Sequence, residues 1–96
     1  MLFHLTHIHS HENCFAHKPE VLKALGAHFK SADEKGVHIL SLHVAPWEHT
    51  WYGVVEAESA EAVERFMDPM LELGHAKVTP VTDVIATIEK RLAGNW

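Results

Sequence analysis

Residues that can bind transition metals are concentrated near the start of the chain. Residues 4–17 contain five histidines and the protein's only cysteine: His4, His7, His9, His11, Cys14 and His17. Neutral imidazole and thiolate bind zinc, copper, nickel and iron in a way that carboxylates and amines do not. These histidines alternate with other residue types, unlike those of an affinity tag, so the segment indicates a metal site.

The spacing within this segment selects the candidate ligands. His7 and His9 stand two residues apart on an expected strand, so their side chains share a face at about 6.6 Å along the backbone. His11, Cys14 and His17 follow on a polar connection that can fold back toward them. We predict one divalent transition metal (Zn, Cu or Ni) per chain, held by His7 and His9 together with one or more of His11, Cys14 and His17. Four protein ligands give a structural site, whereas three with a water give a catalytic one.

Other arrangements of these histidines stay open. His49 is a reserve ligand, because antiparallel pairing of the first and third strands would bring it near His9. His4 or His43 can also be a ligand, which would move the site to the interior of a barrel. Alternatively, the segment is only a solvated, histidine-rich edge.

A second candidate site lies on an expected sheet face. On the strand 37–45, side chains alternate between two faces. Ser41 and His43 form the polar side, and the other side, which we expect to meet the helices, is formed by Leu40, Leu42 and Val44.

A tight turn after this strand would pair His43 with Tyr52 across a hairpin, on the polar side. On the first strand, His4 and Thr6 alternate in the way that would place them on this same polar side. Glu56 lies further along the third strand. A histidine, a tyrosine and a carboxylate can transfer protons. This pattern predicts a small enzyme with His43 and Tyr52 as catalytic residues lining a small-molecule pocket, or else a polar seam between two copies.

Hydrophobic periodicity predicts four strands and three helices. Ser59 and Asp83 are the expected N-caps of the second and third helices, Pro69 should break the second, and Pro80 favours an edge position for the last strand. In chain order the expected elements are a strand at 2–9, a helix at 19–35, strands at 37–45 and 51–57, a helix after Ser59, a strand at 77–82 and a helix after Asp83.

This order predicts an α+β fold of the ferredoxin-like βαββαβ class, with an antiparallel sheet and an added C-terminal helix, as a single domain over residues 1–96. Both main helices then cover one face of the sheet. The bare face of so small a domain favours pairing with a second copy, which gives a homodimeric α+β barrel.

Composition limits the partners. The 8 basic and 13 acidic residues give a formal charge of −5, and no basic patch is present, which disfavours nucleic-acid binding. No apolar run approaches the roughly 20 residues of a membrane span, and the start lacks the features of a secretory signal. A single cysteine allows no internal disulfide and suits the reducing cytoplasm. We therefore expect a small cytoplasmic metal-binding protein, with the enzyme or a purely structural dimer as alternatives.

Three segments carry a resemblance to a known family: the opening MLFHLTH, the passage WYGVVEAESAEAVERF, which includes Glu56, and the ending VTPVTDV, which includes residues 78–81. They resemble a family of small stand-alone proteins of unknown function that is itself similar to the dimeric α+β barrel proteins. The resemblance spans most of the chain. It implies the fold and a dimer, and it implies no activity.

Overall fold

The computed structural model describes residues 1–94, and within that range it contains four strands, three α-helices and four short 3-10 helices. The strands and α-helices confirm the expected order. In sequence they are β1 (Leu2–Ile8), α1 (Pro19–Lys30), β2 (Val37–Ala45), β3 (Thr50–Ala57), α2 (Ala60–Met67), β4 (His75–Val81) and α3 (Val84–Leu92). The 3-10 helices are η1 (His11–Asn13), η2 (Asp33–Lys35), η3 (Pro46–Glu48) and η4 (Asp68–Met70).

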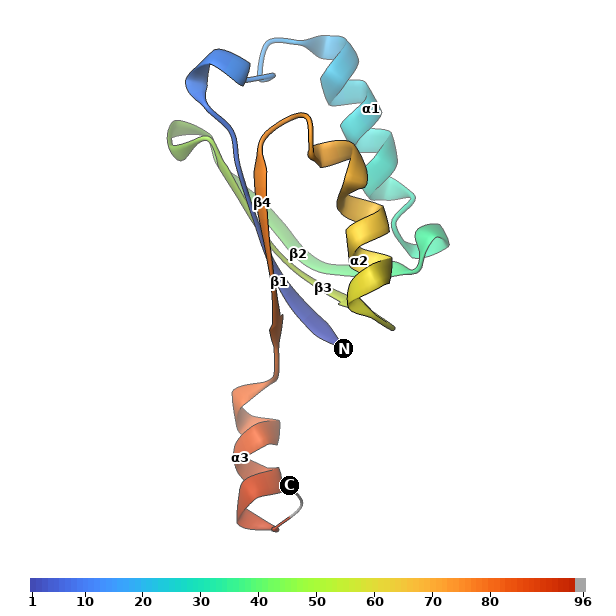
Figure 1. The fold of residues 1–96 in the computed structure, drawn as a ribbon, viewed down its shortest axis with the longest axis vertical. Coiled ribbons are helices and arrows are strands. Elements are labelled where there is room, and N and C mark those ends of the chain that lie inside the picture. The colour runs from blue at the N-terminus through green and yellow to red at the C-terminus, as the bar shows by residue number, and fades with distance from the viewer. Residues whose placement is uncertain (95–96) are drawn as a thin grey trace.

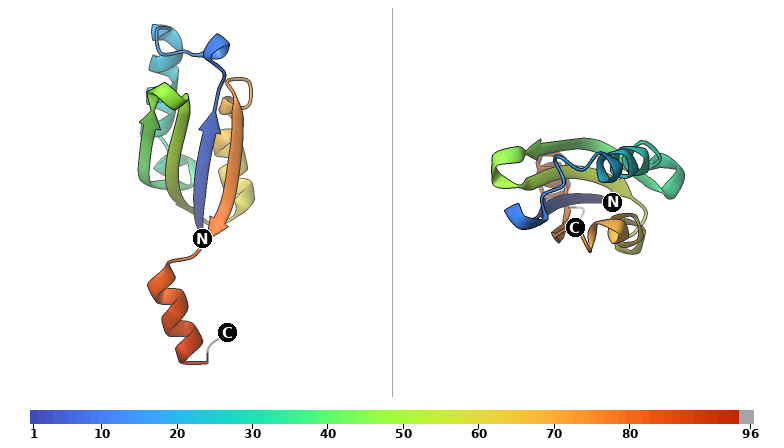
Figure 2. Two further views of the ribbon diagram at one scale, coloured as in Figure 1. Left: turned by 90° about the vertical axis from the view of Figure 1, so that its left-hand side faces the viewer. Right: turned by 90° about the horizontal axis from the view of Figure 1, so that it is seen from above.

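The strands form one antiparallel sheet in the order β2-β3-β1-β4 (Figure 1, Figure 2). β1 is central and pairs with both β3 and β4, so that Leu5 lies opposite Gly53 on one side and Val78 on the other. β4 is an edge strand and carries Pro80. An edge strand tolerates proline because some of its backbone donors need no partner. The expected edge position is confirmed.

α1 and α2 cover one face of the sheet, and the hydrophobic core lies between them and the strands (Figure 1, Figure 2). Side chains of β1 alternate across the sheet, so Phe3 and Leu5 are buried while His4 between them is exposed. α2 contributes Val63 and Phe66, both buried, to the same core. In the left view of Figure 2 the opposite face has no helix over it.

The helix ends follow local chemistry. The Ser59 hydroxyl accepts a hydrogen bond from the Ala62 amide at 3.2 Å, which caps α2 as expected. α2 ends at Met67, two residues before Pro69, which confirms the expected break. α1 ends earlier than expected, at Lys30, and the rest of the predicted helix forms only η2. None of the described helices combines the length and the apolar character needed to cross a membrane.

α3 leaves the rest of the protein instead of packing on it (Figure 1). The Asp83 carboxylate caps it by accepting from the Ala86 amide at 2.8 Å. None of its residues is buried. Its apolar stripe is exposed throughout and consists of Val84, Ile85, Ile88 and Leu92.

A bulge in β2 changes one expected orientation. The register with β3 shifts between Ile39, which lies opposite Val55, and Ser41, which lies opposite Val54. The extra residue is Leu40, which is 52% exposed, whereas Ile39 packs against the core. The prediction that Leu40 faces the helices was therefore wrong, because a bulge interrupts the strict alternation of a strand.

Candidate metal centre

Three side chains from distant parts of the chain meet beyond the end of β1. His9 follows β1, Cys14 lies on the connection to α1, and His49 lies in the turn between β2 and β3. One ligand atom from each residue lies within 4.8 Å of the other two. Among the described residues, these three form the one group of histidine, cysteine or acidic side chains whose ligand atoms lie close enough together to share a metal ion.

Backbone pairing brings two of these residues together. The last register pair of β1 and β3 is Ile8 with Thr50, and the His9 amide donates to the His49 carbonyl at 3.1 Å just beyond it. His49 itself has φ 50° and ψ 38°, in the left-handed region that a residue with a Cβ seldom adopts. Such a conformation persists where surrounding structure enforces it, and it frequently marks a functional position.

Aromatic packing holds the third residue in place. Phe15 directly follows Cys14 and is only 3% exposed. Its ring lies 4.8 Å from the His9 ring and 5.8 Å from the Trp51 ring, centroid to centroid. Burial of Phe15 in the core thereby anchors the connection and keeps Cys14 beside His9.

In the cluster, a ring nitrogen of His49 lies close to a ring nitrogen of His9. His49 Nδ1 lies 3.3 Å from His9 Nε2, within hydrogen-bond distance, so one of these nitrogens can donate its N–H to the other. With metal–nitrogen bonds of about 2.0–2.1 Å, two ligands at a tetrahedral angle lie about 3.3–3.4 Å apart, so this spacing suits a shared zinc-like ion. Burial lowers the pKa of His9 below 6.5, and the neighbouring His49 and His7 lower it further. The ring is therefore neutral, which is the form that binds metals.

His7 lies next to this cluster and is almost fully buried. Its ring centroid is 6.1 Å from that of His9. Its Nε2 lies 3.2 Å from the Met70 carbonyl oxygen, which only accepts, so Nε2 carries the proton. Burial lowers the pKa of His7, although the bond to Met70 opposes this, so the ring is neutral. Its Nδ1 is then an unprotonated, buried acceptor without a hydrogen-bond partner among residues 1–94.

Gly74 makes room for the backbone of β1 and for the His7 ring. A Cβ at this position would clash first with the Ile8 carbonyl oxygen and would also lie 2.9 Å from His7 Nε2, both closer than real Cβ contacts allow. Glycine is therefore required where the turn before β4 passes over the ring. His7 thus connects β1 to the turn before β4 and lies next to the cluster of His9, Cys14 and His49.

The remaining predicted ligands are placed differently. His11 begins η1 and is exposed, and His17 is exposed on the connection to α1. Neither belongs to the group formed by His9, Cys14 and His49. The structure therefore brings together two of the five predicted ligands, adds the reserve residue His49, and keeps His7 adjacent.

The second candidate pair lies on the open face of the sheet. His43 on β2 is the register partner of Tyr52 on β3, and both are exposed. The Tyr52 hydroxyl donates to Glu48 Oε1 at 2.8 Å, and this bond raises the pKa of Tyr52. Thr6 is the partner of Tyr52 on β1, as its parity suggested. The tyrosine hydroxyl is thus engaged by the turn carboxylate.

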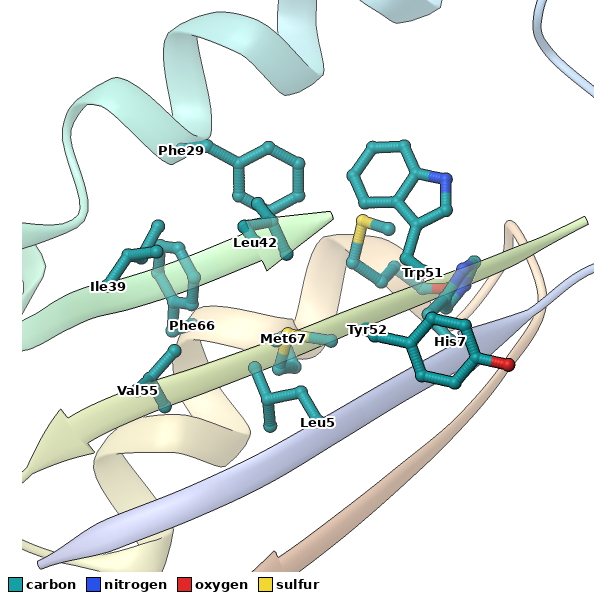
Figure 3. Close-up of a pocket in the computed structure, with 12 residues that line it drawn as sticks. Leu5, His7, Phe29, Ile39, Leu42, Trp51, Tyr52, Val55, Phe66 and Met67 are labelled. Carbon is teal, nitrogen blue, oxygen red and sulfur yellow. The ribbon is translucent and has the colours of Figure 1, made fainter. Parts of the chain in front are cut away.

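A small cavity separates the sheet from α1 and α2 (Figure 3). Its volume is about 20 Å³, which is room for about one water molecule. The lining is almost entirely apolar, and it includes Leu5, Phe29 and Trp51 together with His7. The cavity is therefore too small to hold a substrate.

His49 is the residue that sequence reasoning ranked too low. The feature that could have identified it is the antiparallel pairing of the first and third strands, which places this turn residue beside the end of β1. Sequence proximity favoured His11 and His17 instead, because they lie on the same segment as Cys14. The register of two strands separated by about 40 residues outweighs that proximity.

The chain belongs to the DUF3303 family, a domain family of unknown function, whose sequence profile matches residues 1–94. The expected membership of a family of unknown function is thereby confirmed. No curated protein matches the sequence. Among solved structures, SCO4226 from Streptomyces coelicolor A3(2), known from a crystal structure analysis, has a similar fold. The TM-score is 0.50 at 21% identity, over 83% of this chain and 99% of that chain, a level of identity that supports the fold alone.

Proposed function

We propose that the protein binds one divalent transition metal through His9, Cys14 and His49. The observation that carries the proposal is the convergence of one ligand atom from each residue within 4.8 Å. Two imidazoles and one thiolate suit Zn, Cu and Ni, and they disfavour Mg and Ca, which prefer oxygen ligands. The single thiol also supports a reducing, cytoplasmic setting.

Three features of the structure support ligation over simple packing. The His9 and His49 nitrogens already have the spacing of two ligands on one ion. His49 is held in a left-handed conformation, which glycine would adopt without the steric cost that a Cβ imposes. His9 is 7% exposed and burial lowers its pKa, which favours the neutral ring, and a neutral ring offers one unprotonated nitrogen to a metal.

Metal titration of untagged protein tests the proposal. Co²⁺ serves as a coloured substitute for zinc, and ligation by Cys14 adds a thiolate-to-metal charge-transfer band. We expect one Co²⁺ per chain, displaced by Zn²⁺, and protection of the only thiol from a thiol reagent. His9→Ala, Cys14→Ser and His49→Asn should each weaken binding by about 100-fold or more, since even residues behind a metal site commonly contribute 10–100-fold.

The matched control is the double variant His11→Ala/His17→Ala. Both residues lie on the segment that carries Cys14, both are exposed, and neither belongs to the cluster. This variant should keep the stoichiometry and affinity of the unmodified protein. Equal binding by the control and the cluster variants, or loss of binding in the control alone, would contradict the assignment of His9, Cys14 and His49.

We also propose that the protein is a homodimer of the ferredoxin-like class, in which a second copy covers α3 and the open sheet face. The order β2-β3-β1-β4, with both main helices on one face, supports the class. The chain exposes 6961 Å², against about 5,500 Å² for a compact monomer of its mass. Its radius of gyration is 15.4 Å, against about 12.5 Å. The excess area is enough for a standard interface, which takes roughly 800 Å² from each partner.

Sedimentation equilibrium tests the dimer. Ile85→Asp/Ile88→Asp places charges on the exposed stripe of α3 and should give a monomer, while the unmodified protein stays dimeric at micromolar concentration. Leu71→Asp is the control, because Leu71 is 65% exposed but lies outside α3. A monomeric unmodified protein, or a double variant that stays dimeric, would contradict the proposal.

A further inference from the structure

We infer that the cleft beside the metal cluster binds a small molecule that has an apolar body and a single nitrogen or sulfur donor, with the donor completing the coordination of the metal. The inference rests on the proposed function, because the donor needs a metal to bind. It adds a ligand class to that function.

The cleft and the cluster share residues. A cleft of about 250 Å³ is lined by all three cluster residues, His9, Cys14 and His49. The cleft is more than ten times the size of the cavity behind the sheet, and it has room for a ligand of one or two rings. Its apolar walls include Phe15, Leu22, Val44, Pro46 and Trp51.

The cluster leaves a coordination position open toward this cleft. Three protein donors are one fewer than a tetrahedral ion requires, and a site with three protein ligands commonly takes a water or substrate in the fourth position. Because His9, Cys14 and His49 all border the cleft, an exogenous donor approaching through it reaches the ion. A closed structural site would have a fourth protein ligand instead.

The lining determines the chemistry of the ligand. None of the described residues that line the cleft is Lys, Arg, Asp or Glu, so a carboxylate, phosphate or ammonium group finds no counter-charge there. Phe15 and Trp51 present aromatic rings packed edge to face, which suit a planar apolar body. Leu22 and Val44 are 42% and 52% exposed, and a bound molecule would remove this apolar surface from water.

A matched pair of ligands tests the inference on the Co²⁺-loaded protein. Imidazole offers the donor alone, and 4-phenylimidazole offers the same donor with an aromatic body. Binding is followed by the change in the Co²⁺ ligand-field spectrum. We expect 4-phenylimidazole to bind about tenfold tighter than imidazole or more, since burying a phenyl ring removes apolar surface from water.

Cleft variants identify where the phenyl group binds. Leu22→Ala/Val44→Ala should reduce the preference for 4-phenylimidazole severalfold and leave Co²⁺ affinity unchanged, because neither residue belongs to the cluster. Leu71→Ala, at an exposed leucine outside the cleft, is the control and should keep the preference.

Each result separates the inference from the function on which it rests. Normal Co²⁺ binding without a preference for the phenyl compound, or with a preference that the cleft variants do not change, overturns the inference and leaves the proposed function intact. Failure of Co²⁺ to bind to the unmodified protein overturns both.

Discussion

The two faces of β1 carry the same residue type and give it opposite environments. His7 points toward the helices and is 2% exposed. His4, on the same strand, points to the open face and is exposed. His9, in the same direction beyond the strand end, is 7% exposed. On the helix side burial lowers the pKa of both rings, which favours their neutral forms, and each ring has a buried Nδ1 that finds no partner among the described residues.

This difference shows that the side of the sheet on which a histidine lies determines its burial and its protonation. Burial disfavours the protonated ring, so each histidine on the helix side keeps one unprotonated ring nitrogen at about pH 7. On the open face, the Tyr52 hydroxyl donates to the Glu48 carboxylate in the adjacent turn, and this bond raises the pKa of Tyr52.

The largest difference in stability is expected between alanine variants of the two faces. His7→Ala removes a buried ring and leaves the Met70 carbonyl without its donor, so it should lower the free energy of unfolding by about 2–4 kcal/mol. His4→Ala should have a much smaller effect, because His4 is exposed. Urea unfolding of the metal-free variants measures both. Equal losses would show that the two faces do not differ energetically.

The pH dependence of stability sharpens the same comparison. His7 and His9 have pKa values below 6.5 when folded, so the unfolded chain takes up protons first as the pH falls. Stability of the metal-free protein should be highest above about pH 6.5 and should fall as the pH drops below it.

Urea midpoints with a chelator present, at about pH 8 and about pH 5.5, measure this fall. His7→Phe/His9→Phe should reduce the fall, while His11→Ala/His17→Ala should preserve it. A midpoint that rises toward low pH would contradict the buried, neutral state of His7 and His9.

The turn residue His49 offers a smaller test of strain. Glycine adopts its left-handed backbone freely, whereas alanine at this φ costs roughly 1–2 kcal/mol. His49→Gly should therefore be more stable than His49→Ala by about 1 kcal/mol in metal-free protein, although both lose the ligand. Thermal unfolding compares them. A more stable alanine variant would show that the turn relaxes away from the left-handed conformation.

The smallest expected effect concerns the open face. Tyr52 is the only tyrosine, so the ultraviolet titration of tyrosine reports it alone. Its hydroxyl donates to Glu48, which holds the pKa above 10.0. Glu48→Gln should lower that pKa toward its ordinary value, and Glu56→Gln, a carboxylate elsewhere on the same strand, should not. An unchanged titration in Glu48→Gln would show that this bond is absent in solution.

Much of the candidate site could be predicted from sequence. The shared direction of His7 and His9 follows from the period of two in a strand, and the nearness of His49 to His9 follows from strand pairing. The choice among His11, Cys14 and His17 could not be made in the same way. It depends on the path of a connection that is anchored by burial of Phe15 against His9 and Trp51.

The sequence by itself determined the element order, the caps at Ser59 and Asp83, the break before Pro69 and the edge position of Pro80, because each depends on local backbone chemistry or on periodicity. Only the tertiary structure decided the bulge at residue 40, the separation of α3 from the sheet, and the meeting of His9, Cys14 and His49. These features depend on register and on packing between distant segments. Local spacing constrains neither, since a one-residue shift between two strands changes which side chains share a face.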